Sequence, residues 1–216
     1  LGNESIDNLQ TMAENQFRPV ANNNRVIEPY NVPLVEASRL PLKARVIPLK
    51  ELRELSLLFE LPQQDKNWKV KPAMYLGEMI GYEGQGSLLQ ALKEKGWAES
   101  LSAGPALSDR GATLFSIDIG LTPEGYQHHE QILVELFAWL ELIQQEGIES
   151  WRQTELAVMS DMGFRYAEKI KPADYVTKLA SNMHKYSDNN LLRAPYQRGE
   201  FDKQLISDLM DQLSIE

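Results

Sequence analysis

Alternating apolar and polar positions predict strands in the middle of the chain. Leucine or phenylalanine occupies every second position of 54–61, with mostly polar residues between them. The segment 113–121 alternates in the same way, with Asp118 on its polar side. A period of two residues is typical of a strand that buries one face. Two further strands are predicted at 44–49 and 98–104.

Two short helices are predicted on either side of a glycine-rich turn. The first covers 72–80, and the turn follows at 81–86. The second begins at Ser87, which is expected to form a capping box with Gln90, and it stops at Gly96. Glycines in such a turn suit backbone conformations that other residues avoid.

Longer helices dominate the second half of the chain. Thr122 followed by proline is a strong helix start, and apolar residues then recur at helical spacing. The predicted helices span 122–147, 151–169, 172–186 and 202–213. Strands followed by helices are typical of an α+β domain, so we predict an antiparallel β-sheet with helices packed on one face.

The first quarter of the chain has a different character. An irregular apolar stripe in 5–17 predicts a helix without a nearby partner, and three prolines between 27 and 42 favour an extended connector. The chain starts at Leu1 with no signal-peptide pattern, so we expect a piece of something longer rather than a processed product. The predicted organisation is a terminal helix of a preceding domain at 1–24, a proline-rich linker at 25–43 and a main domain at 44–216.

Composition and charge exclude several classes of protein. The 216 residues carry 22 basic and 31 acidic side chains, a net charge of −9, which argues against a nucleic-acid binder. There is no cysteine, which excludes thiol catalysis and thiolate zinc sites. No apolar run is long enough to predict a membrane-spanning helix.

The three histidines do not predict a metal site. His128 and His129 are adjacent, so their side chains diverge by about 100° on a helix, and His184 stands alone. A metalloprotease helix needs two histidines one turn apart with a glutamate, and neither that motif nor its inverted form occurs. A Gly-x-Ser-x-Gly nucleophile motif is also absent from the sequence. We therefore expect no zinc ligand and no catalytic residue in this chain.

One interpretation of the glycine-rich turn is a phosphate-binding loop, because Gly84-Gln85-Gly86 precedes the start of a predicted helix. However, Leu89 stands where a dinucleotide fingerprint has its third glycine, and the turn follows a helix rather than a strand. The favoured interpretation is a tight turn between helices that needs positive φ. An independent small-ligand binder is the least favoured function.

The segment 75–97 carries the most specific signal, and reads YLGEMIGYEGQGSLLQALKEKGW. It resembles the insulinase (pitrilysin-type) zinc metallopeptidases, in which a similar Gly-His-Glu-Gly-x-Gly-Ser-Leu-Leu stretch ends in Lys-Gly-Trp. The connector beginning at Tyr30, the segment 47–50 (similar to the family's first strand) and the segment 164–166 also have family counterparts. The resemblance covers most of residues 20–186.

This resemblance implies four homologous α+β domains that close around a peptide chamber, with the zinc motif in the first. The chain resembles the end of the first domain and all of the non-catalytic second one, so zinc is expected in the parent enzyme and no cofactor in this part. In the insulin-degrading branch, the glycine-rich turn and the strand after Gly-Trp form an exosite for the amino end of peptides. By resemblance, the exosite residues are Gly81, Tyr82, Glu83, Leu101, Ser102, Ala103 and Gly104. Tyr82 replaces the usual histidine, and Pro105 replaces the second glycine after the strand, which removes one backbone donor.

Two functions follow from the resemblance. The favoured one is part of an insulinase-like zinc metalloendopeptidase that forms chamber wall and substrate exosite, with peptides and other domains of the same chain as partners. The alternative is a non-catalytic structural or assembly subunit, and the upstream reading frame discriminates between them. The helix at 5–17 leaves a homodimer open, nucleic-acid and membrane partners are not expected, and the compartment, cytoplasmic or periplasmic, stays open.

Overall fold

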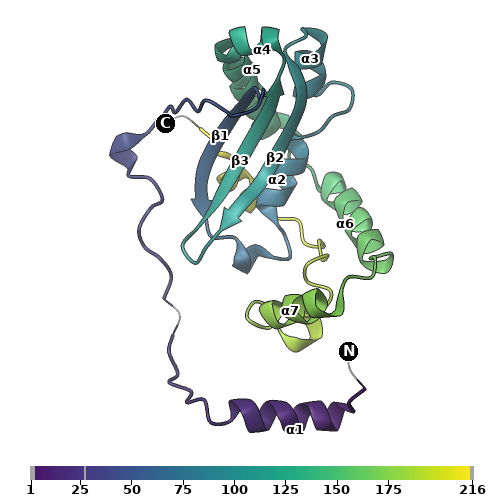
Figure 1. Cartoon of the computed structure of the whole chain (residues 1–216). Coiled ribbons are helices and arrows are strands. Elements are labelled where there is room, and N and C mark those ends of the chain that lie inside the picture. The colour runs from purple at the N-terminus through teal and green to yellow at the C-terminus, as the bar shows by residue number, and fades with distance from the viewer. Residues whose placement is uncertain (1–2, 27, 215–216) are drawn as a thin grey trace.

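A three-stranded antiparallel sheet lies at the centre of the computed structural model, which describes residues 3–26 and 28–214. The strand order is β1-β3-β2, from β1 (Glu54–Pro62), β2 (Ala98–Ser108) and β3 (Ala112–Leu121). Figure 1 looks onto one face of this sheet, with helices behind it. The strands predicted at 54–61, 98–104 and 113–121 are confirmed, and β2 continues beyond its predicted end through Pro105.

The register of the strands puts the apolar residues of all three on one face. Leu57 pairs with Ile117 in the β1–β3 ladder, and Leu101 pairs with Ile119 in the β2–β3 ladder. The β2–β3 connection is tied by Asp109, whose carboxylate accepts hydrogen bonds from two backbone N–H groups of the turn at 2.7 and 2.8 Å. These backbone hydrogen bonds lower the pKa of Asp109. The hairpin holds these ends of β2 and β3 together, and the register then shifts between Pro105 and Leu107 and again between Ala98 and Ser100.

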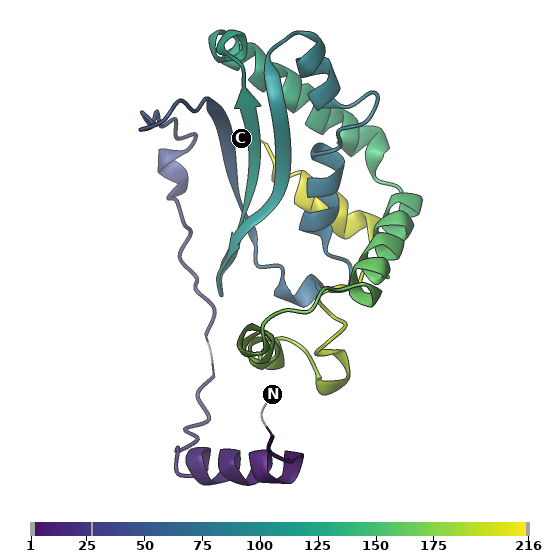
Figure 2. The same cartoon turned by 45° about the vertical axis from the view of Figure 1, so that its right-hand side comes forward.

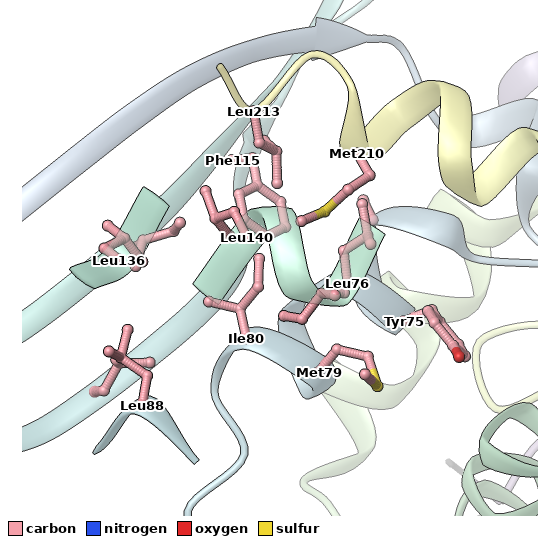
Figure 3. Close-up of a cluster of buried hydrophobic side chains, with 14 of the residues drawn as sticks. Tyr75, Leu76, Met79, Ile80, Leu88, Phe115, Leu136, Leu140, Met210 and Leu213 are labelled. Atoms are coloured by element: carbon pink, nitrogen blue, oxygen red, sulfur yellow. The ribbon is translucent and has the colours of Figure 1, made fainter. Parts of the chain in front are cut away.

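Helices cover the apolar face of the sheet, so the predicted α+β architecture is confirmed. They are α2 (Pro72–Ile80), α3 (Leu88–Glu94), α5 (His129–Leu142) and α8 (Lys203–Met210), and Figure 2 shows them on one side only. Figure 3 shows how their side chains meet those of β3. The side chains that form this core include Tyr75, Leu76, Ile80, Leu89, Leu92, Phe115, Ile117, Ile119, Ile132, Leu136 and Ile206, each less than 2 % exposed.

The helix predicted at 122–147 is divided in the structure. Thr122 caps α4 (Pro123–Gln127) as expected, accepting a hydrogen bond from the backbone N–H of Gly125 at 2.9 Å. The backbone leaves helical geometry at His128, α5 follows, and a π-helical turn, Ile143–Gly147, ends the segment. The remaining long helices are α6 (Ser150–Arg165) and α7 (Pro172–Met183). Short 3₁₀ turns occur at Ala37–Arg39, Asp65–Asn67 and Asp188–Asn190.

The strand predicted at 44–49 is wrong, and so is the family-based assignment of 47–50 as a first strand. This segment is irregular, and Ile47 and Leu49 are 88 % and 106 % exposed. Pro48 lacks a backbone N–H and interrupts any ladder, and no sheet position is offered to the segment because β1 pairs only with β3. An apolar run alone therefore does not make a strand.

The apolar stripes of α6 and α7 are largely exposed, although Leu156 of α6 packs against the core. Met159, Met162 and Tyr166 of α6 are 67 %, 55 % and 79 % exposed, and α7 has no buried residue. Both helices lie away from the sheet, beyond the end of α2 (Figure 1). The stripe of α8 does reach the core, because Leu209 and Leu213 are buried.

The N-terminal helix α1 (Ile6–Phe17) stands apart from the rest of the protein. Ser5 caps it, but none of its residues is buried, and both views place it away from the sheet (Figures 1 and 2). The extended connector after it runs along β1, where the backbone N–H of Leu34 donates to the Glu60 carboxylate at 2.8 Å. None of the described helices has the length and apolar character needed to span a bilayer.

Candidate functional site

The candidate site is built on an unusually close approach of α2 to β2. Gly77 is buried in α2, and a Cβ atom at this position would lie 2.6 Å from the Ala103 carbonyl oxygen and 2.9 Å from the Gly104 Cα. Only hydrogen fits in that space. The end of α2, and with it the glycine-rich turn, is thereby held directly against the middle of β2.

The structure brings the turn and the strand together at Gly81. A Cβ atom built on Gly81 would be 3.5 Å from the Ala103 nitrogen and 4.0 Å from the Ser102 Cα. The backbone N–H of Gly81 donates to the Gly77 carbonyl at 2.8 Å, so this residue ends α2 in a fixed position. The two stretches that the family resemblance selected, separated by some twenty residues, therefore meet in space.

The next two residues of the turn point into solvent. Tyr82 is 51 % exposed and its ring folds back onto Gly84, while Glu83 is exposed. Among the described residues no hydrogen bond or ion pair involves the Glu83 carboxylate, which leaves it available to a ligand. Gly86 has φ +79°, so the expected positive φ in the turn is confirmed at this residue.

The strand half of the site is an edge of the sheet. Because the order is β1-β3-β2, one side of β2 carries no partner strand in the described part of the chain. Leu101 is only 3 % exposed and faces the core, so it can contribute backbone groups alone, whereas Ser102 is exposed. Gly104 has φ +154°, a region in which side chains are rarely found. Pro105 stands in an edge strand, where its missing N–H is tolerated.

Two backbone N–H groups that a phosphate would need in this turn already donate hydrogen bonds within the protein. The Ser87 side chain accepts from the Gln90 backbone N–H at 3.1 Å, and the Gln90 side chain accepts from the Gly86 backbone N–H at 2.6 Å. The expected capping box is thus present in altered form. The Gln90 side chain accepts from the backbone N–H of Gly86 instead of that of Ser87. These N–H groups are already used within the protein, so the turn offers little to an anion.

Cationic side chains hold α2 at its start and near its end. Lys71, in the left-handed conformation at φ +52°, donates to the carbonyls of Ala194 and Pro195 at 3.2 and 2.6 Å. Burial, with a smaller contribution from the charge of Arg198, lowers the pKa of Lys71 to about 8. Burial also lowers the pKa of Arg198, whose guanidinium is 3.8 Å from the carboxylate of Glu78 in the last turn of α2. Lys71 therefore anchors the start of α2, which lies apart from the glycine-rich turn.

The described residues hold no group of three or more histidine, cysteine, aspartate or glutamate side chains that could bind a metal ion. His128 stacks on Trp97 with ring centroids 4.7 Å apart and lies 3.0 Å from the Glu124 carboxylate. Its neighbours are thus an aromatic ring and one carboxylate. The described residues therefore do not fit a zinc ion.

Two surface cavities lie away from the glycine-rich turn and the β2 edge. A cavity of about 420 Å³ between α6 and the segment after α7 is lined by residues that include Asp161, Arg193 and Tyr196. Asp161 already pairs with Arg193 at 2.9 Å and with Arg165 at 2.7 Å. The cavity holds none of the predicted site residues, so we do not place the site there.

Sequence reasoning missed Gly77, the residue that positions the whole site. A glycine inside an otherwise apolar helix is a signal of close packing, and it could have been singled out on that ground. Its partner could not be named, because the contact depends on which strand lies under α2.

Comparisons with known proteins give the same family for two segments that together make up most of the chain. Residues 1–156 match the family described as "Peptidase M16 inactive domain", and residues 164–216 match the "Middle or third domain of peptidase_M16". The chain is 33 % identical over 213 residues to the Arabidopsis thaliana protein "Insulin-degrading enzyme-like 1, peroxisomal" and 34 % identical over 213 residues to the Homo sapiens "Insulin-degrading enzyme". Each alignment covers 99 % of this chain but only 22 % and 21 % of the relative.

Solved structures agree at the level of the fold. The crystal structure of pitrilysin superposes with a TM-score of 0.90 at 23 % identity, covering 97 % of this chain and 22 % of that one. A protease from Helicobacter pylori superposes with a TM-score of 0.65 at 15 % identity. The chain spans about a fifth of the length of the Arabidopsis thaliana and Homo sapiens relatives named above.

Proposed function

Because the chain belongs to the peptidase M16 family, with most of its length matching the inactive domain, we propose that it is the substrate-anchoring, non-catalytic part of an insulinase-like zinc metalloendopeptidase. It forms part of the chamber wall, and its exosite holds the amino end of a peptide while chemistry takes place elsewhere. Zinc, in this proposal, is bound by a part of the longer protein outside this chain, in keeping with the poor fit of the described residues to a metal ion.

One observation carries the proposal: the glycine-rich turn lies against the unpaired edge of β2. An extended peptide can add to such an edge by backbone hydrogen bonds, which require little from the side chains of the receiving strand. Glu83 is exposed in the turn that starts at this edge, so its carboxylate suits a peptide ammonium group. We assign Gly81, Tyr82, Glu83, Leu101, Ser102, Ala103 and Gly104 to this exosite.

The same proposal covers the domain organisation. Residues 1–24 are assigned to the end of a preceding domain, 25–43 to the linker and 44–216 to the second domain. The apolar side chains of α1 support this assignment, since Ile6 and Phe17 are 82 % and 72 % exposed and pack on nothing in the described chain.

Substitution of Glu83 by glutamine tests the anchoring role. A partly exposed carboxylate–ammonium contact contributes about 0.2–1 kcal/mol, so Glu83→Gln should weaken binding of a peptide with a free amino terminus by at most about fivefold. The affinity of this chain for peptides labelled at the carboxyl end is measured by fluorescence anisotropy. The same peptides with an acetylated amino terminus should bind the variant and the parent chain equally.

The matched control is Glu168→Gln, which removes an exposed glutamate beyond the end of α6. It should leave both peptides unaffected. If free and acetylated peptides respond alike to Glu83→Gln, or neither responds, the anchoring role of Glu83 is wrong. In the full-length peptidase, Glu83→Gln should raise KM for long peptides with a free amino terminus.

A further inference from the structure

The outer face of the sheet, opposite the helices, carries a carboxylate on the strand next to the edge strand β2. Asp118 of β3 pairs with Ser102 of β2 on one side and with Ser56 of β1 on the other, so the three side chains form one row. Its neighbours Ile117 and Ile119 are fully buried on the inner face, which places Asp118 on the outer face. No helix covers this face (Figures 1 and 2).

The β2 side of this carboxylate is open. In the adjoining rows, Ser100 pairs with Gly120 and Gly104 pairs with Ser116, so the β2 residues on either side of Ser102 in these rows are small. Within residues 3–26 and 28–214, no hydrogen bond or ion pair occupies the Asp118 carboxylate. The acidic Glu54, two positions along β1 from Ser56, accepts a hydrogen bond from the Ser56 hydroxyl at 3.3 Å and adds to the negative potential.

A peptide paired with the β2 edge would bring its own side chains to this face. Neighbouring strands lie about 4.8 Å apart, so the peptide backbone would be about 10 Å from that of β3. A peptide side chain beside Ser102 would point to the same face as Asp118. The long, flexible stem of lysine or arginine can cross the small Ser102 and bring a cation to the carboxylate, whereas short side chains cannot.

The position of the glycine-rich turn decides which residues of a bound peptide lie beside Ser102 and Asp118. Gly81 lies close enough to β2 that an added Cβ atom would be 3.5 Å from the Ala103 nitrogen and 4.0 Å from the Ser102 Cα, so a peptide whose amino group meets Glu83 has its first residues beside Ser102. We propose that Asp118 is a specificity-determining residue of this edge and selects peptides that carry lysine or arginine among their first three residues. This inference rests on the proposed function and adds a substrate class to it.

General attraction between an acidic protein and basic peptides is the competing explanation. The chain has a net charge of −9, so any basic peptide gains some affinity through the long-range field. That effect depends on peptide net charge and hardly on the position of the charge. A positional preference at fixed composition therefore separates a specific contact with Asp118 from the general field.

The test uses three peptides of equal length with a carboxyl-terminal fluorophore, a free amino terminus and moderate salt. One has a single lysine at the second residue, one has it near the carboxyl end, and one has glutamine in its place. With the unmodified chain, anisotropy should show about two- to fivefold tighter binding of the first peptide than of the second. Asp118→Asn should remove this preference, and Asp118→Glu should keep it.

The matched control is Glu54→Gln, which removes the same charge from the same face but from β1, one strand farther from the edge. It should leave the positional preference in place. The inference is overturned if the preference is absent from the unmodified chain, persists in Asp118→Asn, or disappears equally in Glu54→Gln. Urea unfolding of each variant shows whether the sheet is retained, and Asp118→Glu supplies a folded comparison.

The outcome also separates this inference from the function on which it rests. Peptides that bind in a Glu83-dependent way without a positional lysine preference overturn the role of Asp118 alone. Failure of every peptide to bind, with the free amino terminus making no difference, overturns both.

Discussion

Gly77→Ala is expected to destabilise the domain by about 3 kcal/mol and to weaken peptide binding along with it. The added methyl group would lie 2.6 Å from a backbone oxygen of β2 and 2.9 Å from a backbone carbon. These backbone atoms belong to a strand paired with β3 and cannot rotate away as a side chain can, so α2 must move as a whole and loosen its contacts with the core. The turn at Gly81 would move with it, away from the strand edge.

Urea denaturation followed by far-UV circular dichroism measures this change. Gly199→Ala is the matched control, because a Cβ atom there would meet nothing within 4 Å. That control should alter the free energy of unfolding by less than about 0.5 kcal/mol. Equal stability of Gly77→Ala and the unmodified chain would show that α2 does not lie on β2 as described.

Phe115→Ala is expected to have the largest effect on stability, about 3–5 kcal/mol. Phe115 is fully buried in the central strand, between Phe59 and Pro105 in the ladder and beneath the helices (Figure 3). Its removal leaves a cavity that the close-packed side chains around it cannot fill without strain. A domain of ordinary stability, 5–15 kcal/mol, would be close to unfolding.

The control for this substitution lies on the neighbouring strand but on the opposite face. Leu58 of β1 is 61 % exposed, so Leu58→Ala should cost less than about 0.5 kcal/mol in the same denaturation experiment. Similar losses at the two positions would contradict the assignment of inner and outer faces, on which the role proposed for Asp118 also depends.

The strands that could be predicted from the sequence were those whose apolar face packs against the helices. The alternation in 113–121 marks one buried face unambiguously, and β3 occupies the centre of the sheet with both neighbours in place. The pattern in 54–61 was equally clear because Leu55, Leu57 and Phe59 face the same helices. The caps at Ser87 and Thr122 could also be predicted, since each is a local side-chain-to-backbone bond.

The failures share one physical cause, which is that burial depends on a partner. Apolar residues in 44–49 resemble a strand, yet Ile47 and Leu49 meet no other side chains. The stripes of α6 and α7 have correct helical spacing but remain largely exposed. A periodic pattern reports which face can be buried, and the structure decides whether anything lies against it.

The candidate site could be located only in part from the sequence. The resemblance selected two stretches, and the structure shows that Gly81 lies against Ser102 and Ala103. The reason for this approach, the missing side chain at Gly77, required the packing of α2 on β2. The role proposed for Asp118 required the strand register, because its row with Ser102 cannot be read from the one-dimensional pattern.

The central proposal, that a peptide adds to the free edge of β2, is tested most directly by amide hydrogen exchange of residues 101–104. The chain is measured alone and with a saturating peptide that has a free amino terminus. The account predicts that the edge-facing amides in this stretch exchange at least tenfold more slowly with peptide bound, while the amides of β1 are unchanged. Peptide binding at saturation with no slowing in residues 101–104 would contradict it.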